Sequence, residues 1–273
     1  MAEARGFSLL ERFELKYHIP VAWADRIGAF LAPYCEEDYY SKITPGGFYY
    51  ITNLYLDSPK WTFLGWKKKQ LLDRFNMRIR TYGEHPAQDG TFHFECKRKI
   101  RNICYKSRAT IKGINPGEVW HMKPDEWPCK GDKDRMYLKD FLYKANLHNA
   151  HPRLLTQYKR RAWFGLREEY SRVTIDTGMR FREENGFDYT VEPQYMHSTG
   201  LPRFFQPGCD AVLELKCPAA QMPFWMFDLI KTLNLKHGAF SKFGNAAAEW
   251  KRVYENPRRF KSPYWTQLAG NFG

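Results

Sequence analysis

The sequence contains no run of about 18 apolar residues, the length that indicates a helix crossing a membrane. We therefore expect no transmembrane segment. The N-terminal stretch MAEARGFSLLERFELKY carries acidic side chains and lacks a long apolar core, which is not the pattern of a signal peptide. These absences predict a cytoplasmic protein, and they leave open a separate membrane protein as its partner.

Cysteine is present at six scattered positions, and no two of them have the spacing of a zinc knuckle or a redox motif. We expect free thiols, as in a reducing compartment. The sequence also shows no Ser-His-Asp or Cys-His arrangement typical of nucleophilic catalysis.

Acidic residues are outnumbered: 43 Lys and Arg stand against 30 Asp and Glu, which gives a net charge of +13. This balance predicts an anionic partner, which could be nucleic acid, a nucleotide, polyphosphate or acidic lipid. The chain is 43% hydrophobic and 17% aromatic, so it has the composition of a folded protein. Charge alone does not choose among these partners.

Three short stretches each contain a Glu-x-Lys pair in a pattern typical of β-strands. They are Phe13–Lys16, Phe94–Lys97 and Leu213–Lys216. Side chains alternate between the two faces of a strand, so the Glu and Lys of each pair share one face, and the residue between them points the other way. The same alternation places Arg78 and Arg80 on one face of their strand.

The pattern along the chain predicts an α+β protein with one domain over residues 1–273 and a largely antiparallel sheet. The expected strands cover residues 9–19, 49–57, 74–82, 91–100, 103–112, 153–164, 170–177 and 211–217. The expected helices cover residues 20–32, 59–69, 134–149, 223–235 and 245–254. Residues 115–133 are interpreted as a loop or insertion without assigned chemistry, and the lysines at 67–69 as a solvated helix end.

So many charged side chains on the strands require contact with water, because burying unpaired charges costs several kcal/mol each. One interpretation is a wet, cationic cavity that faces a polyanion. The alternative is a solvated outer face with salt bridges between strands. In the first case Glu95 and Glu214, among so many cations, are natural oxygen ligands for Mg²⁺ or Mn²⁺, and the chemistry is phosphoryl transfer.

Eight short motifs, in order, resemble the catalytic domain of the vacuolar transporter chaperone (VTC) family of polyphosphate polymerases. They are Arg12-x-Glu14-x-Lys16, Leu54–Ser58, Arg78-x-Arg80, Phe94-Glu95-x-Lys97, Tyr158-x-Arg160, Arg172–Asp176, Leu213-Glu214-x-Lys216 and Phe240–Phe243. The resemblance covers about residues 11–244, followed by a C-terminal helix and a tail to residue 273. It implies a triphosphate tunnel (CYTH-like) fold, in which about eight antiparallel strands form a closed barrel with flanking helices.

The resemblance also implies an ATP-polyphosphate phosphotransferase with ATP, pyrophosphate and polyphosphate as ligands and Mn²⁺ or Mg²⁺ as cofactor. The catalytic cations it implies are Lys16, Arg78, Arg80, Lys97, Arg160, Arg172, Lys216 and Lys242. Lys106, Arg108 and Lys99 are weaker candidates for substrate binding. Glu214 is the leading metal ligand, Glu95 the second and Asp176 the third, whereas Glu14 is expected to balance charge only.

The sequence departs from related patterns in two ways, and the first of them favours the polymerase branch over a triphosphatase. The wider tunnel superfamily often begins with Glu-x-Glu-x-Lys, but Arg12 occupies the first of these positions here. The chain also lacks an SPX-like helical domain and membrane helices, so it resembles a stand-alone catalytic domain of bacterial type. The alternatives are a tunnel triphosphatase that hydrolyses inorganic or nucleoside triphosphate, and a non-enzymatic binder of polyphosphate or nucleic acid.

Overall fold

The computed structural model describes residues 12–101, 103–168, 170–200, 203–218 and 221–255. Residues 9–11 of the first predicted strand and the predicted tail after residue 255 lie outside this part of the chain.

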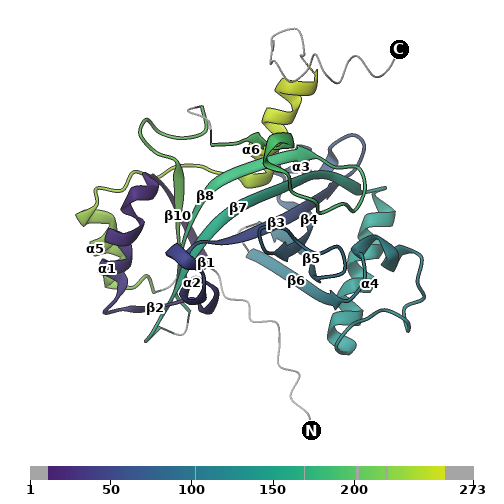
Figure 1. Cartoon of the computed structure of the whole chain (residues 1–273), viewed down its shortest axis with the longest axis horizontal. Helices are drawn as coiled ribbons and strands as arrows, with labels where there is room; N and C mark the ends of the chain where they lie inside the picture. Colours follow the sequence, from purple (N-terminus) through teal and green to yellow (C-terminus); the bar gives the residue numbers. More distant parts are fainter. Residues whose placement is uncertain (1–11, 102, 169, 201–202, 219–220, 256–273) are drawn as a thin grey trace.

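One antiparallel sheet organises the molecule (Figure 1). Its strands lie in the order β1 (Arg12–Ile19), β10 (Ala211–Pro218), β8 (Arg172–Glu183), β7 (His151–Gly165), β3 (Tyr49–Asp57), β4 (Asp73–Tyr82), β5 (Thr91–Ile100) and β6 (Ile103–Lys112). Two short strands extend it: β2 (Cys35–Glu37) pairs with β7, and β9 (His197–Ser198) pairs with β8. The α+β class and the antiparallel sheet predicted from the sequence are confirmed.

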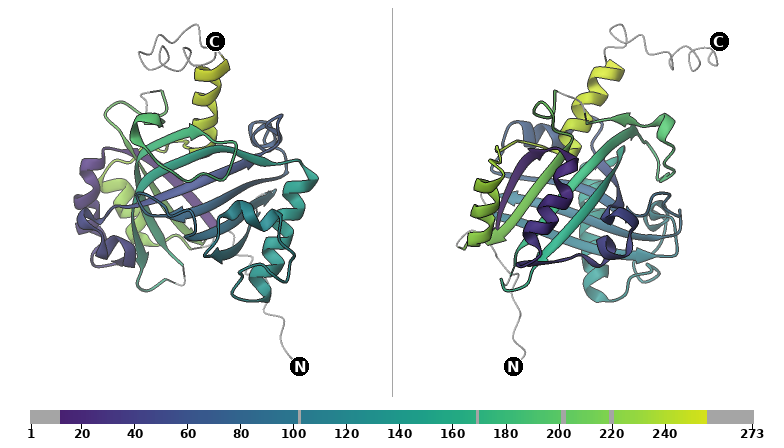
Figure 2. Two further views of the ribbon diagram at one scale, coloured as in Figure 1. Left: turned by 45° about the vertical axis from the view of Figure 1, so that its right-hand side comes forward. Right: turned by 60° about the vertical axis from the view of Figure 1, so that its left-hand side comes forward.

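The closed barrel that we expected is not confirmed. The strand order begins at β1 and ends at β6, and within the described residues no hydrogen-bonded ladder joins these two strands. The sheet nevertheless curls strongly (Figure 2). Lys97 on β5 reaches Glu14 on β1, with 3.0 Å between Nζ and Oε1, although these strands lie near opposite ends of the strand order. An ion pair between side chains therefore connects the two ends of the curled sheet.

Strand β8 is longer than the sequence pattern predicted. It continues past Thr177 to Glu183, through Gly178, which has a φ of +60°. Its pairing with β7 shifts register between Gln157 and Lys159, so a bulge bends both strands at this point. Glycine adopts this backbone conformation without the steric cost of a side chain, and the ladder can therefore resume beyond it.

Helices cover the convex side of the sheet and one end of the curled sheet. They are α1 (Ala24–Leu31), α2 (Tyr39–Ile43), α3 (Thr62–Lys68), α4 (Asp132–Leu147), α5 (Phe224–Thr232) and α6 (Lys242–Trp250). Single 3-10 turns occur at Val21–Trp23, Pro45–Gly47, Pro116–Trp120 and Pro193–Tyr195, and a π turn, Lys251–Glu255, follows α6.

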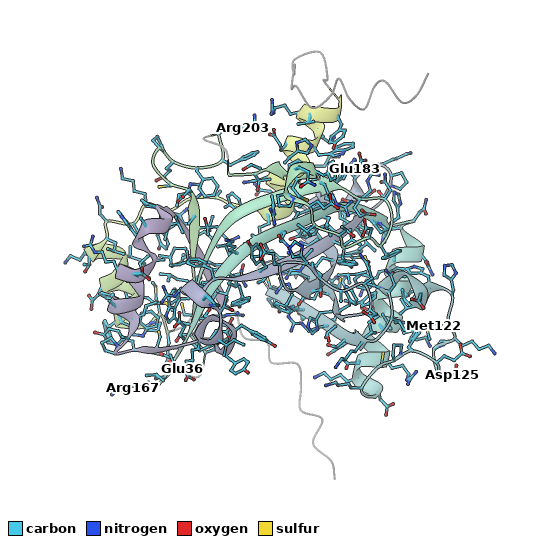
Figure 3. All side chains as sticks on the ribbon, viewed as in Figure 1. Glu36, Met122, Asp125, Arg167, Glu183 and Arg203 are labelled. Carbon is cyan, nitrogen blue, oxygen red and sulfur yellow. The ribbon has the colours of Figure 1, made fainter. Side chains whose placement is uncertain are left out.

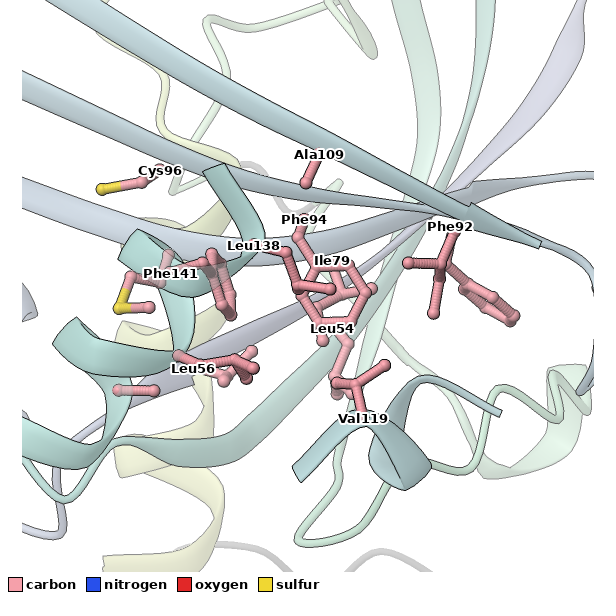
Figure 4. Packing of buried hydrophobic residues seen from close by; sticks show 14 of the residues in the cluster. Leu54, Leu56, Ile79, Phe92, Phe94, Cys96, Ala109, Val119, Leu138 and Phe141 are labelled. Carbon is pink, nitrogen blue, oxygen red and sulfur yellow. The ribbon is translucent and has the colours of Figure 1, made fainter. Parts of the chain in front are cut away.

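Two apolar layers cover the convex side, and the charged residues predicted to share a strand face lie on the concave face, beside smaller apolar clusters such as that of Ile51 and Tyr158. Residues of β3–β6 pack against α4, with Phe94, Leu138 and Phe141 among the fully buried side chains (Figure 4). Residues of β1, β10, β8 and β7 pack in a second cluster that includes residues of α1 and α5. Because the apolar face of each strand is used on the convex side, the alternate residues face the inside of the curl.

The segment 115–133, interpreted as a loop or insertion, is part of the first of these layers. Val119 and Trp127 are buried in it, and Trp127 Nε1 donates a hydrogen bond to the Val119 carbonyl at 3.1 Å. Its position indicates a role in covering the sheet.

The start of α3 is held by Asp57, a fully buried carboxylate at the end of β3. Its Oδ1 accepts from the backbone N–H groups of Ser58 (2.8 Å) and Phe63 (2.9 Å), and its Oδ2 accepts from that of Leu64 (3.0 Å). Burial raises the pKa of Asp57, and the three backbone donors oppose that shift. This carboxylate therefore fixes α3 to the sheet.

Replacing Asp57 with alanine should lower the free energy of unfolding by about 3 kcal/mol, because three buried N–H groups lose their acceptor. Chemical denaturation of the Asp57→Ala variant measures this loss. Asp125→Ala is the matched control, since Asp125 is an exposed carboxylate at the periphery of the molecule (Figure 3). Equal stability of the two variants would contradict this role of Asp57.

Candidate functional site

The concave face gathers charged residues from seven strands, β1, β4, β5, β6, β7, β8 and β10, and from α6. Register places Lys16 opposite Glu214, Glu14 opposite Lys216, and Arg160 opposite Asp176. On the other side of the curl, Arg78, Glu95 and Arg108 lie opposite one another across β4, β5 and β6. The alternation read from the sequence therefore correctly identified which residues share a face.

Glu95 is the centre of the densest charge cluster, and its side chain is 1% exposed. Its partners are Arg78 (Nε to Oε2, 2.7 Å), Arg108 (Nε to Oε1, 2.8 Å), Lys106 (Nζ to Oε1, 2.7 Å) and Arg80 (Nη2 to Oε2, 3.7 Å). Burial alone would raise the pKa of Glu95, but these four cations outweigh it and hold that pKa far below its usual range. One carboxylate thus holds four cations together.

A second cluster forms around Asp176 of β8, which is fully buried. Arg160 donates two parallel hydrogen bonds to it, Nε to Oδ1 at 2.6 Å and Nη2 to Oδ2 at 2.7 Å. Lys242, the first residue of α6, lies 2.6 Å from Oδ2 and also 4.7 Å from the centre of the Tyr158 ring. Burial opposes ionisation of Asp176, but Arg160 and Lys242 lower its pKa well below normal. Helix α6 therefore adds a cation to the strands.

A third cluster joins β1, β10 and β5 through two glutamates. Glu214 lies 3.1 Å from Lys216 Nζ and 3.7 Å from Lys16 Nζ, and burial is outweighed by these cations, so its pKa is lowered. Glu14 contacts Lys97 at 3.0 Å and lies 4.0 Å from Lys216. Lys216 therefore stands between the two carboxylates. From the sequence we expected Glu14 to balance charge only, yet it also links strands near the two ends of the curled sheet.

Several polar atoms on this face have no protein partner within the described part of the chain. They include Asn53 Nδ2, Thr174 Oγ1 and Arg172 Nε, all buried. Arg172 packs its guanidinium 4.8 Å from the centre of the Phe164 ring. Buried donors are almost always hydrogen-bonded in folded proteins. Two of these three atoms are N–H donors, which suits an anionic ligand.

Lys67 on α3 is a site residue that the sequence interpretation missed. Its Nζ contacts the Ser241 hydroxyl, which also accepts the Gly244 N–H at 3.0 Å and so begins α6. Desolvation by the surrounding side chains and then four nearby cations, Lys16 first among them, lower the pKa of Lys67 to about 8. The run at 67–69 was interpreted as a solvated helix end, and these three lysines are indeed exposed. What the sequence did not indicate is that Lys67 also lies beside the charge clusters, because a helix pattern does not show which strands the helix faces.

The remaining predicted residue, Lys99, lies two positions beyond Lys97 on β5 and opposite Cys104 of β6. It therefore lies farther along the strand than the three clusters, and its side chain is half-buried. The structure brings the other predicted cations and all three predicted metal ligands into these clusters or beside them.

The charges on this face do not balance. Four carboxylates, Glu14, Glu95, Asp176 and Glu214, face the ten cations Lys16, Arg78, Arg80, Lys97, Lys106, Arg108, Arg160, Arg172, Lys216 and Lys242. These excess cations repel one another and attract a polyanion, and each arginine can donate two parallel hydrogen bonds to phosphate oxygens. The arrangement can therefore bind and polarise a chain of phosphates.

The carboxylates differ in how well they suit a metal ion. Both oxygens of Glu95 and both of Asp176 are taken by cations, so a metal there would compete with arginine. Glu214 pairs with two lysines, Lys16 and Lys216, and Glu14 lies on the neighbouring strand. Within the described residues no three potential ligands gather, so an ion at Glu214 would share its coordination with ligand oxygens. Of the three carboxylates Glu214 is the one whose surroundings suit such an ion better, and the metal roles predicted for Glu214, Glu95 and Asp176 all stay predictions.

Lys106 should take up a proton when a polyphosphate binds. Its side chain is 44% exposed, but desolvation within the charge cluster and then the neighbouring arginines lower its pKa to about 7, despite the attraction of Glu95. Above that pKa the free amine is neutral, and a bound polyanion restores its charge, so affinity falls as pH rises through this range. Calorimetry with tripolyphosphate at about pH 8, in buffers of different ionisation enthalpy, measures the uptake. It should shrink in Lys106→Met, and identical uptake in both proteins would contradict this assignment.

Removing the charge of Glu95 should weaken the fold and leave it dependent on an anion. We expect Glu95→Gln to lower the free energy of unfolding by about 2 kcal/mol, less than for a fully buried pair because Lys106 and Arg108 are partly exposed. Tripolyphosphate should restore most of this loss. Thermal unfolding of Glu95→Gln with and without tripolyphosphate measures both effects. Glu36→Gln is the control, because it alters an exposed pair with Lys42. A loss of the same size with and without tripolyphosphate would argue against this view of Glu95.

Comparison with known proteins agrees with the motif order. The family model of the VTC domain matches residues 11–251. No curated protein sequence matches the chain. Within the part of the chain that the structure describes, no helix is both long and apolar enough to cross a membrane.

Solved structures similar to this chain include three of low sequence identity. A candidate adenylate cyclase from Bacillus halodurans is 13% identical, with 84% of this chain and 92% of that chain covered and a TM-score of 0.46. A protein from Pyrococcus horikoshii is 10% identical, with 88% and 99% covered and a TM-score of 0.43. A candidate adenylyl cyclase from Hippeastrum, described as having a dominant triphosphatase activity, is 11% identical, with 87% and 95% covered and a TM-score of 0.41.

The family match spans the strands that carry all three charge clusters, from β1 to α6. The chain therefore belongs to the VTC domain family.

Proposed function

We propose that this protein is a polyphosphate polymerase that transfers the γ-phosphoryl group of ATP onto a growing inorganic polyphosphate chain. The observation that carries the proposal is the excess of cations over carboxylates on the concave face of a VTC domain. Phosphoryl transfer needs little covalent chemistry from the protein, and positioning with electrostatic stabilisation supplies most of the catalysis. Pyrophosphate or a shorter chain is the proposed acceptor.

In the proposed reaction a terminal oxygen of the acceptor attacks the γ-phosphorus of ATP. The bond from that phosphorus to the β,γ-bridging oxygen breaks, and ADP leaves with the bonding electrons. The attacking oxygen is already anionic, so no general base is required. Arg78 and Arg80, held by Glu95, and Arg160, held by Asp176, are fixed in place before the substrate binds. Preformed cations stabilise the charge of the transition state without reorganising.

Glu214, with Glu14 on the neighbouring strand, is the proposed ligand of a Mn²⁺ or Mg²⁺ ion. When bound, such an ion neutralises phosphate oxygens and orients them. Lys16 and Lys216 lie on either side of Glu214 and hold it in the cationic surface. Lys16 also donates a hydrogen bond to the Phe240 carbonyl at 3.0 Å, which fixes the direction of its side chain.

The product of the reaction distinguishes the candidate activities. Purified protein incubated with ATP and Mn²⁺ should give a polymer longer than triphosphate, resolved by gel electrophoresis, together with ADP. Release of monomeric phosphate alone would identify a tunnel triphosphatase instead. Tight binding of single-stranded nucleic acid without ATP turnover would identify a non-enzymatic binder.

Arg78→Ala should lower the rate of polymer formation by about 100-fold, the typical effect of removing one electrostatic clamp. Glu95 keeps three cationic partners in this variant, so the fold should survive. Lys159→Ala is the matched control, because Lys159 is exposed on the opposite face of β7 from Arg160 and packs on the Tyr50 ring. Full activity of Arg78→Ala, or equal losses in the two variants, would overturn the assignment of the concave face.

A further inference from the structure

A cluster of aromatic rings stands at one end of the charged face. Tyr40 on α2 stacks on Tyr82 at the end of β4, with ring centres 5.9 Å apart and planes 6° apart. Tyr39 meets Tyr40 edge-on, Tyr49 at the start of β3 contacts both Tyr40 and Tyr82, and His93 meets Tyr82 edge-on. We call Tyr39, Tyr40 and Tyr82, which carry the accessible ring surface, the aromatic platform.

The platform presents its rings to solvent on a fixed base. Tyr39 is 66% exposed and Tyr40 is 49% exposed, whereas Tyr49 beneath them is 8% exposed. Large aromatic rings usually bury most of their surface in a folded protein. The exposed Tyr40 ring is already held by its stack on Tyr82, so it offers a flat apolar surface at little entropic cost.

Helix α2 is fastened to the strand that carries Arg160. The Ala162 N–H donates to the buried Ser41 hydroxyl at 3.0 Å, and the Asp38 N–H donates to the Ala162 carbonyl at 2.8 Å. Ala162 lies two residues beyond Arg160, on the same face of β7. The position of the platform is therefore set by the backbone of the charge cluster itself.

The inner rings of the cluster also adjoin the cations. Tyr82 follows Arg80 by two residues on the same face of β4. Burial and then Arg108 lower the pKa of His93 to about 4, so this ring is neutral at physiological pH. Tyr49 lies opposite Arg160 in the pairing of β3 with β7. Burial raises the pKa of Tyr49, and Arg160 and Arg172 act against that shift.

A flat aromatic surface joined to a cationic surface matches one ligand chemistry, a planar base connected to a chain of phosphates. Bases stack on tyrosine whatever their identity, and a purine offers the larger surface. Inorganic triphosphate and polyphosphate have no group that gains from stacking. On α2 itself Ile43 is the one exposed aliphatic residue beside Tyr39 and Tyr40.

We propose that the aromatic platform is the subsite for the base of a purine nucleoside triphosphate, whose phosphates occupy the adjoining cationic face. This inference rests on the proposed function, because it names how that site would distinguish ATP from inorganic phosphates. The base extends the stack of Tyr82 and Tyr40 on the exposed ring of Tyr40, with Tyr39 edge-on beside it, and the triphosphate extends toward Arg80 and Arg160.

The test compares two ligands that differ only in the nucleoside. Calorimetry measures the dissociation constants of adenosine 5′-(β,γ-imido)triphosphate and inorganic tripolyphosphate for the full chain. Tyr40→Ala should weaken binding of the nucleotide analogue about tenfold, the value of one base–ring stack, and leave tripolyphosphate within about twofold. Tyr40→Phe should keep the wild-type preference because it keeps the ring. Tyr143→Ala is the control, since Tyr143 is a 64% exposed tyrosine on α4.

Unchanged nucleotide affinity in Tyr40→Ala overturns the proposal, and so does an equal loss for both ligands. Thermal unfolding of Tyr40→Ala separates a local effect from a damaged fold. A fall in its unfolding temperature with a matching fall for tripolyphosphate counts against the subsite. These measurements report binding without turnover. A protein that lacks polymerase activity can therefore still confirm or overturn the base subsite.

Discussion

The attraction between a few buried carboxylates and a larger number of cations governs the concave face. Glu95 holds four cations within one cluster, and Asp176 holds Arg160 and Lys242. Without these carboxylates the cations would repel one another, and with more of them the face would have no attraction left for a polyanion. The arrangement therefore balances the stability of the fold against a residual positive charge that can hold phosphate.

The rest of the fold creates the space in which this balance works. Two apolar layers on the convex side use up one face of every long strand, which leaves the alternate residues to the inside of the curl. The ion pair between Lys97 and Glu14 joins strands near the two ends of the sheet. Helices α3 and α6 then bring Lys67 and Lys242 against the strands, and the Ser241 hydroxyl, which contacts Lys67, begins α6.

The two proposals describe one continuous surface. The cationic face suits a chain of phosphates, and the aromatic platform at its edge suits the base of a nucleotide. Helix α2 is bonded to Ala162, next but one to Arg160, so the two parts share a strand and keep a fixed separation. A donor bound across both parts would be oriented along the charged face, with its terminal phosphate pointing inward.

The sequence by itself determined which residues face inward, since alternation along a strand is a local property of the backbone. Arg78, Glu95, Arg160 and Lys216 were placed on one face correctly for this reason. Tertiary structure alone decided which charges meet. Glu14 pairs with Lys97 from the far end of the sheet, Lys67 arrives on a helix interpreted as solvated, and Tyr40 stacks on Tyr82 from a separate helix. These contacts depend on how far the sheet curls and where helices dock, and both are set by packing between segments distant in sequence, which local patterns do not encode.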